Sequence, residues 1–208
     1  MVDEAGVTFK RDACGTTALH LACRYGTLDM VRTMVRNRSP IEARDLFQTT
    51  ALTYALMLSK IAIAEYLIQM GANVETPGHI GDTPLMDSVS HCCHDSADLL
   101  LRLPCNYLSV NNYGSTVLHY AGKYPNASMM QVLARHDLSG LDPLAKQKDG
   151  LTAMEIFEQT EAKSDALVQA FNELLRSILQ RNGNFGPWEE GGGEAVEVFH
   201  DAVEEVEM

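Results

Sequence analysis

Two histidines and two cysteines stand side by side at His91-Cys92-Cys93-His94, and their side chains are of the types that bind metals. Imidazole and thiolate are good ligands for zinc or copper, and a cysteine thiol can also react by itself. The spacing argues against a metal centre, because no Cys-x2-Cys pair is present and adjacent residues on a helix point about 100° apart. His91 and His94 could share a face, with His79 as a distant third ligand. We therefore expect no metal and no cofactor, and a metal-binding or thiol-reactive site is an alternative interpretation.

The cysteines also have a simpler interpretation, since free cysteine is often buried as a small hydrophobic residue. We expect Cys92 or Cys93 to pack between helices. His20 and His119 could each act as a catalytic base if considered alone, but both follow a leucine in a repeated segment, which favours a structural role. The chain has no Gly-rich phosphate loop, no Gly-x-Ser-x-Gly motif and no His-Glu-x-x-His motif. We predict that it is not an enzyme.

A six-residue segment recurs five times, and the elements built on it must position these side chains. Its copies begin at positions 15, 48, 81, 114 and 150, so that successive copies are 33, 33, 33 and 36 residues apart. A fixed period of this length is typical of a solenoid, in which each unit buries its apolar face only against its neighbours. The copies are Gly15-Thr16-Thr17-Ala18-Leu19-His20, Gln48-Thr49-Thr50-Ala51-Leu52-Thr53, Gly81-Asp82-Thr83-Pro84-Leu85-Met86, Gly114-Ser115-Thr116-Val117-Leu118-His119 and Gly150-Leu151-Thr152-Ala153-Met154-Glu155.

Each copy contains the signals of a helix start. A threonine at its third position can accept a hydrogen bond from the free amides of the first helical turn, and a small residue or proline follows in most copies. A short apolar helix comes next, and then a second helix with its own apolar stripe. Helices this short are marginal in water, so they depend on stacking against their neighbours. The expected N-cap residues are Thr17, Thr50, Thr83, Thr116 and Thr152.

These copies resemble the ankyrin-repeat family, whose signature at this place is Gly-x-Thr-Pro-Leu-His. The resemblance covers roughly residues 12 to 182 and implies an all-α solenoid of about five helix-turn-helix repeats joined by short extended fingers. It also implies that the histidines bond to backbone in the neighbouring finger. The copies depart from regularity where Gln48 replaces the turn glycine, and where Arg38 and Pro104 stand in the place of Gly71. A left-handed turn residue other than glycine costs about 1 kcal/mol.

The chain is expected to form one repeat domain between two flanking segments. Residues 1–11 form an N-terminal lead-in, residues 12–182 the ankyrin-repeat domain, and residues 183–208 an acidic, flexible tail. The repeats start near residues 12, 45, 78, 111 and 147, and an apolar stripe predicts a capping helix at about 165–181. The lead-in is too short for a polar capping repeat, so either the first repeat is itself polar outside or the chain is a piece of a longer protein.

The resemblance also implies where a partner binds, namely on one concave surface lined by the fingers and the inner helices. Contact residues in the family lie on the finger beside the turn glycine and at the end of the first helix. Large apolar and aromatic side chains occupy several of these positions, as is typical of interface anchors, although some could instead pack between repeats. The expected partner-binding residues are Tyr25, Phe47, Met57, Leu58, His79, Ile80, Tyr113, Lys123 and Tyr124.

The tail has a pattern of its own after three glycines at 191–193. Residues 185–208 carry eight acidic and no Lys or Arg side chains, whereas residues 1–44 carry seven basic and five acidic ones. The tail could form an acidic helix on a partner, dock on the basic first repeat or in the groove, or only solubilise the chain. Docking on a second copy would give weak head-to-tail association, but a monomer is expected. The apolar residues of the tail motif are Val196, Phe199, Val203 and Val206.

The composition excludes several classes of protein. With 28 acidic and 16 basic residues, the 208-residue chain has a formal charge of −12, which disfavours binding to nucleic acids. No N-terminal apolar run resembles a signal peptide, and polar residues interrupt the most apolar stretch, 51–68, so we expect no membrane association. Five cysteines without a disulfide spacing fit a reducing compartment, and we expect an intracellular location, cytoplasmic or nuclear.

The function that these observations favour is a non-catalytic protein-interaction module, which presents a rigid concave groove to a partner protein or peptide. A rigid groove binds with little ordering cost. Two alternatives are a metal or thiol-reactive site around His91–His94 and the repeat portion of a longer multidomain regulatory protein.

Overall fold

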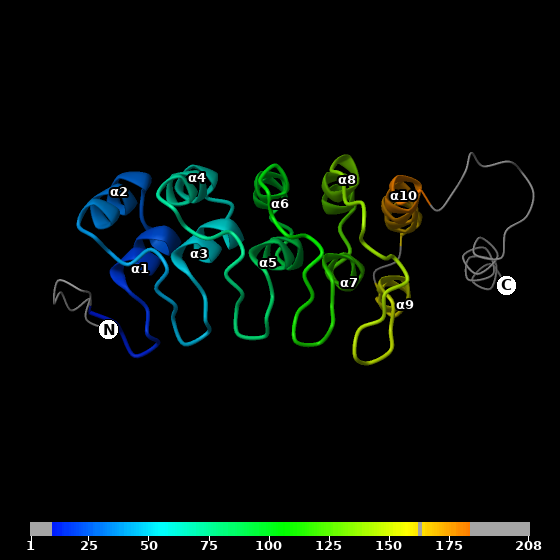
Figure 1. Ribbon diagram of the computed structural model, residues 1–208, viewed down its shortest axis with the longest axis horizontal. Helices are drawn as coiled ribbons and strands as arrows, with labels where there is room; N and C mark the ends of the chain where they lie inside the picture. The colour runs from blue at the N-terminus through cyan, green and yellow to red at the C-terminus, as the bar shows by residue number, and fades with distance from the viewer. Residues whose placement is uncertain (1–9, 162–163, 184–208) are drawn as a thin grey trace, which may run out of the picture.

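The computed structural model describes residues 10–161 and 164–183, and in these residues the chain forms ten α-helices and no β-strand. The helices alternate along the chain between two rows, and the extended fingers project beyond the inner row (Figure 1). The inner row consists of α1 (Ala18–Tyr25), α3 (Ala51–Met57), α5 (Pro84–Ser90), α7 (Val117–Lys123) and α9 (Ala153–Glu158). The outer row consists of α2 (Leu28–Arg36), α4 (Ile61–Gln69), α6 (His94–Leu101), α8 (Ala127–Arg135) and α10 (Asp165–Arg181). The solenoid expected from the repeats is confirmed.

The inner helices begin where the sequence predicts. Each of the five follows its repeat threonine in an extended conformation, and the hydroxyl oxygen of four of these threonines accepts a hydrogen bond from the backbone N–H three residues later. Glu155 adds a reciprocal bond at α9, because its carboxylate accepts from the N–H of Thr152 at 2.6 Å. Pro84 occupies the first position of α5, where its missing N–H costs nothing.

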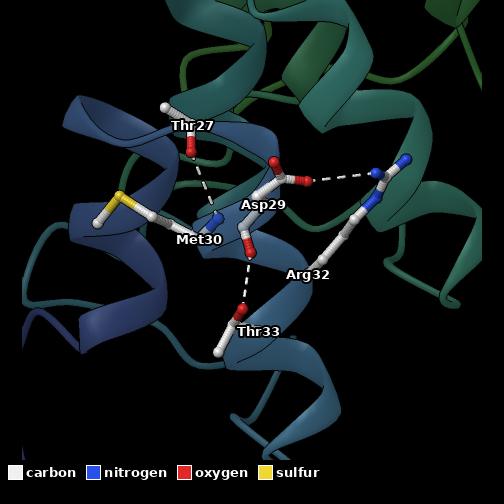
Figure 2. Close-up of polar contacts among 5 residues, drawn as sticks. All are labelled: Thr27, Asp29, Met30, Arg32 and Thr33. Atoms are coloured by element: carbon white, nitrogen blue, oxygen red, sulfur yellow. Dashed lines mark hydrogen bonds and ion pairs between the residues drawn. The ribbon is translucent and has the colours of Figure 1, made fainter.

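The outer helix α2 begins in the same way, as Figure 2 shows. The hydroxyl oxygen of Thr27 accepts from the N–H of Met30 at 3.4 Å. Asp29 lies in the first turn, where its charge is favourable near the helix N-terminus, and its carboxylate is 3.4 Å from Arg32. The hydroxyl of Thr33 donates to the backbone carbonyl of Asp29 at 2.8 Å. The Asp29–Arg32 pair is exposed and so adds little stability, whereas the cap fixes the point where the helix starts.

The core lies between the two rows and runs the length of the described solenoid. Leucines at equivalent positions of successive inner helices, such as Leu19, Leu52 and Leu118, are fully buried. At the C-terminal end, Phe157 of α9 and Phe171 of α10 stack with ring centroids 4.8 Å apart. Because each helix is short, this shared burial between neighbours is what stabilises it.

The turns confirm two expectations and correct a third. Gln48 and Arg38 have φ angles of 60° and 59°, the left-handed conformation expected where other repeats have glycine. Pro104 does not adopt this conformation, because the pyrrolidine ring fixes φ at a negative value. Instead α6 ends at Leu101 with Arg102 as its C-cap, and the N–H of Leu103 donates to the carbonyl of Leu100.

Backbone hydrogen bonds join most neighbouring fingers. The N–H of Leu46 donates to the carbonyl of Cys14 at 2.9 Å, and equivalent bonds join the third finger to the fourth and the fourth to the fifth. Within residues 10–161 no such backbone bond joins the second finger to the third. The side chains of Asp12, Asp45 and Asn111 each accept two N–H groups of their own finger, whereas Gly78 stands at this place in the third. The second and third fingers are therefore the neighbouring pair with the fewest backbone hydrogen bonds between them in the described residues.

Candidate functional site

One face of every inner helix stays open, and it is the same face in each repeat. In α5, for example, Leu85, Met86, Ser88 and Val89 are buried, whereas Asp87, Ser90 and His91 are not. Together with the finger tips, these open faces form a continuous surface that we call the inner surface. It consists of residues 13–14, 46–47, 79–80, 112–113 and 148–149 on the fingers, and 21, 24–25, 54, 57–58, 87, 90–91, 120, 123–124, 156 and 159–160 on the helices.

All nine side chains that the sequence predicts as partner contacts lie at these inner-surface positions. Among the large hydrophobic ones, Tyr25, Phe47 and Tyr113 are the most exposed, with 71%, 64% and 54% of their surface accessible. Met57 is half-buried, so part of its surface packs within the solenoid. The others are exposed, and they are Leu58, His79, Ile80, Lys123 and Tyr124.

The structure brings three of these nine residues into one cavity. Ile80, Tyr113 and Lys123 line a hollow of about 630 Å³ at the C-terminal end of the inner surface, together with Tyr120 and Asp149. The other six lie outside this cavity and are spread along the rest of the surface. A hollow with aromatic, aliphatic and charged walls can hold several side chains of a bound peptide.

Cations lie over several of the aromatic rings. The guanidinium of Arg24 lies 5.0 Å from the ring centroid of Tyr25 and 5.6 Å from that of Tyr54. The ammonium of Lys123 lies 5.5 Å from the ring centroid of Tyr124, and the Tyr124 ring stacks on Tyr120 with a centroid separation of 6.2 Å. Such contacts restrict the exposed side chains and leave less side-chain entropy to lose on binding.

A row of hydrogen-bonded tyrosines and acids lies behind these exposed side chains. The hydroxyl of Tyr54 donates to Asp45 at 2.8 Å, and that of Tyr120 donates to Asp82 at 2.6 Å. Asn111 donates a second bond to the same oxygen of Asp82 at 2.7 Å. Burial and the bond to Asp45 raise the pKa of Tyr54 to about 12, and burial and Asp82 raise the pKa of Tyr120 as well.

Asp87 occupies the place of these tyrosines in the third repeat, since residues 54, 87 and 120 are 33 apart. Burial raises the pKa of its carboxyl to about 7, and the negative charge of Asp82 adds to the shift. Tyr54, Asp87 and Tyr120 were not among the residues expected from the sequence. Their common repeat position, one helical turn before the expected contacts, is the signal that could have found them.

Comparison with known proteins agrees with this architecture. Residues 2–78 match a family model described as ankyrin repeats (3 copies). This part of the chain carries ankyrin repeats. Repeats of this family are in general protein-binding and non-catalytic.

Segments similar to this chain occur in much longer proteins. The E3 ubiquitin-protein ligase KEG of Arabidopsis thaliana is 30% identical over 128 residues, which cover 58% of this chain and 8% of that protein. The Neurogenic locus notch homolog protein 1 of Xenopus laevis and that of Homo sapiens are each 25% identical over 126 residues, covering 60% of this chain and 5% of the relative. The chain thus spans less than a tenth of the length of these relatives. In the described part of the chain, no helix is long and apolar enough to cross a membrane.

In the third repeat, residues 91–93 link α5 to α6, and His94 is the first residue of α6. Cys93 is the cysteine that packs between helices, and its thiol donates to the carbonyl of Met57 at 3.0 Å. The Nδ1 atom of His91 lies 2.9 Å from the Asp87 carbonyl, and the Nε2 atom of His94 lies 3.0 Å from the Asn126 amide oxygen. Across the described ranges, no three His, Cys, Asp or Glu side chains are placed to hold a metal ion. The geometry gives no support to the alternative metal site.

The two repeated histidines differ from each other. The Nδ1 atom of His20 accepts from the N–H of Thr17, and its Nε2 atom lies 3.1 Å from the carbonyl of Thr49, as the family resemblance implies. His119 makes the first of these contacts, with Thr116, but its Nε2 atom faces the next finger without a hydrogen-bond partner in the described residues. The longer step of 36 residues between the fourth and fifth copies coincides with this difference. Burial lowers the pKa of both imidazoles, so both favour the neutral form.

The apolar tail residues at 196, 199, 203 and 206 lie outside the described residues, as does the lead-in up to residue 9.

Proposed function

We propose that this chain is a non-catalytic protein-interaction module, and that its inner surface is a concave groove that takes a partner protein or peptide. The observation that carries the proposal is where the large exposed hydrophobic side chains lie. Many of them occur at equivalent inner-surface positions of successive repeats, and these are Tyr25, Leu46, Phe47, Leu58, Ile80, Tyr113 and Tyr124. An exposed apolar and aromatic surface of this kind is characteristic of a binding site.

The way in which the surface is held supports the same proposal. Fingers joined by backbone hydrogen bonds, and tyrosines with cations over their rings, lose little conformational freedom when a partner binds. Aromatic side chains then supply contact area, and Lys123 and Asp149 supply charges at the C-terminal end. The partner-binding set that we propose is the nine residues predicted from the sequence, extended by Tyr54, Asp87 and Tyr120.

The class of partner and the cellular compartment that we propose rest on the net charge and on the free thiols. A formal charge of −12 supports a protein partner in preference to a nucleic acid. All five cysteines are free, which supports a reducing, intracellular compartment, cytoplasmic or nuclear. We also propose that residues 12–182 act as the binding domain, with 183–208 as a separate acidic tail and a monomeric solution state.

The lengths of the relatives support a second proposal, that the repeats belong to a longer multidomain regulatory protein. The matched segments make up 8% of the KEG ligase and 5% of the Notch homologues. Sequencing of the full transcript tests this, because further coding sequence for another domain would support it and its absence would contradict it.

The experiment that tests the groove compares a double variant with a matched control. Phe47→Ala with Tyr113→Ala removes two exposed rings from the second and fourth fingers of the inner surface. Met30→Ala with Met70→Ala removes two apolar side chains, 50% and 47% exposed, from α2 and from the end of α4 in the outer row. Partners captured by the wild-type chain are identified by mass spectrometry, purified and titrated against all three chains. We expect the groove variant to bind at least about tenfold more weakly with unchanged circular dichroism, and the control to bind normally. Equal binding by the groove variant would show that the partner sits elsewhere.

A further inference from the structure

Asp87 lies in the middle of the inner surface, in line with two tyrosines. Tyr54, Asp87 and Tyr120 occupy one position in three successive repeats, on helices α3, α5 and α7. The buried residues of α5 are Pro84, Leu85, Met86, Ser88 and Val89, so the Asp87 side chain lies on the open face. The exposed finger tips of the same repeats carry Phe47, Ile80 and Tyr113.

Asp87 differs from its two neighbours, because its side chain has no hydrogen-bond partner among the described residues. Each tyrosine hydroxyl is bonded to a carboxylate, that of Asp45 or Asp82. The carboxylate of Asp87 accepts no hydrogen bond and forms no ion pair with any residue of 10–161 or 164–183. Ser90 and His91 bond to its backbone carbonyl, not to its carboxylate. Asp87 is half-buried, and a half-buried carboxylate without a protein partner is costly, so a natural surface keeps one chiefly where function needs it.

Among the described residues, the charged groups around Asp87 include no basic side chain that pairs with its carboxylate. Asp82 lies close enough for its charge to disfavour ionisation of Asp87, and its own oxygen is already bonded to Tyr120 and Asn111. Lys123 on α7 lies over the ring of Tyr124, and Arg24 on α1 lies over Tyr25 and Tyr54. The remaining titratable groups beside it, Tyr54 on α3 and His91 at the end of α5, bring no cation to the carboxylate. The inner surface therefore presents the carboxylate of Asp87 at its centre, with the buried carboxylate of Asp82 behind it, and no basic group of the described residues pairs with Asp87.

We propose that Asp87 is the anchor for a lysine or arginine side chain of the bound partner, which is seated on the inner surface in the row formed with Tyr54 and Tyr120. This inference rests on the proposed function and specifies the chemistry of the partner segment. A cation there is attracted by the negative charge of Asp87 at short range and by that of Asp82 at longer range. The bound partner excludes water from the site, which strengthens both attractions. The tyrosine rings and the apolar finger tips pack against the aliphatic stem of the same side chain.

Binding of a cation has a proton-linked consequence. The carboxyl of the free chain is half-protonated at about pH 7, because its pKa is about 7. A cationic side chain favours the ionised form and lowers this pKa, so binding releases a proton. Affinity therefore increases as the pH rises through 7 and decreases as Asp87 becomes protonated below it.

The test uses phage-displayed random peptides selected on the full chain at about pH 8, where Asp87 is ionised. We expect the selected peptides to share a lysine or arginine, and a synthetic peptide with norleucine or methionine in its place to bind at least about tenfold more weakly. Asp87→Asn should lose a similar factor, while Asp95→Asn, which removes an exposed acid on α6, should bind as the wild type does. Affinity for the wild type should decrease between about pH 8 and pH 6, and this dependence should be absent in Asp87→Asn.

Carbon-13 NMR of the Asp87 carboxyl supplies a second measurement that does not depend on affinity. We expect a pKa near 7 in the free chain and a lower one with the selected peptide bound. A pKa near 4 in the free chain, or equal binding by Asp87→Asn and the wild type, would overturn the inference. Peptides that bind Phe47→Ala/Tyr113→Ala as well as the wild type would contradict the groove itself. Peptides that need the groove but neither a cation nor Asp87 would contradict only the anchor.

Discussion

The hydroxyl of Tyr120 donates a 2.6 Å hydrogen bond to Asp82, and this bond joins the inner helix of the fourth repeat to the finger of the third. The equivalent tyrosine of the second repeat, Tyr54, bonds instead to Asp45 in its own repeat. The junction between the third and fourth repeats thus has a buried polar link in addition to its apolar packing. Because solenoid stability is a sum of repeat and interface contributions, a link of this kind acts on one identifiable interface.

Tyr120→Phe should destabilise the chain by about 1–3 kcal/mol, because it removes a donor from a buried, charged carboxylate. Asp82 is 7% exposed, so water cannot easily replace the lost bond. Tyr124→Phe is the matched control, since this exposed side chain makes no hydroxyl hydrogen bond within the described residues. Urea unfolding followed by circular dichroism measures both variants. A Tyr120→Phe chain as stable as the control would mean that the bond contributes nothing.

Asp87→Asn should stabilise the chain at neutral and alkaline pH, although it weakens binding. The carboxyl pKa is about 7 in the folded chain and 3.8 as the reference value, so the folded state binds the proton more tightly. Stability of the wild type is therefore lost as the pH rises from about 4 to about 7, and the loss is complete above that range. The asparagine variant lacks this loss, and its Tm should exceed that of the wild type by at least about 2 °C at pH 8.

The same comparison at about pH 4 provides the control, because the wild-type carboxyl is then protonated in the folded chain and close to its reference pKa in the unfolded chain. The difference in Tm between the two chains should be nearly gone. A difference that is independent of pH would indicate that the substitution acts through packing and not through the charge.

The repeat spacing predicted the fold because each copy carries its own helix start. Thr17 and Thr152 stand in segments with different neighbours, and both cap a helix in the way their position predicts. The exposure of the finger side chains could also be predicted from the sequence, because side chains next to a turn residue on an exposed finger face solvent. Phe47 and Tyr113 illustrate this, and both are more than half exposed.

Other features depend on packing that no repeat signature encodes. Ser59 and Cys92 adopt left-handed conformations with φ angles of 51° and 54°, whereas Gly26 at the equivalent place in the first repeat does not. The positions of glycine in the sequence therefore did not predict which turns between inner and outer helices are left-handed. Asp87 likewise looks like an ordinary polar residue of a short helix until its burial and the nearness of Asp82 are known.

Gln48→Gly should stabilise the chain by up to about 1 kcal/mol, because a left-handed conformation is strained for every residue with a Cβ atom. The φ angle of Gln48 is 60°, and within the described part of the chain its side chain makes one hydrogen bond, of 3.5 Å, with Arg44 on the surface. Gln131→Gly is the contrasting control, since this exposed residue lies in the middle of α8, where glycine costs about 1 kcal/mol. Thermal unfolding should thus move in opposite directions for the two variants. Destabilisation by both would mean that the Gln48 turn is not strained.

The five free thiols should react in an order set by burial. Cys14 is exposed on the first finger, whereas Cys23 is fully buried and burial raises its pKa to about 12. Cys105 is half-buried with a pKa raised to about 11, and the thiol of Cys93 donates a hydrogen bond to a backbone carbonyl.

Because the thiolate is the nucleophile, limiting iodoacetamide at about pH 8 should alkylate Cys14 first and leave Cys23 and Cys93 intact. Peptide mass mapping reads out the order, and the chain unfolded in urea, in which all five should react alike, is the control. Alkylation of Cys23 in the native chain as fast as Cys14 would contradict the packing of α1 against α3.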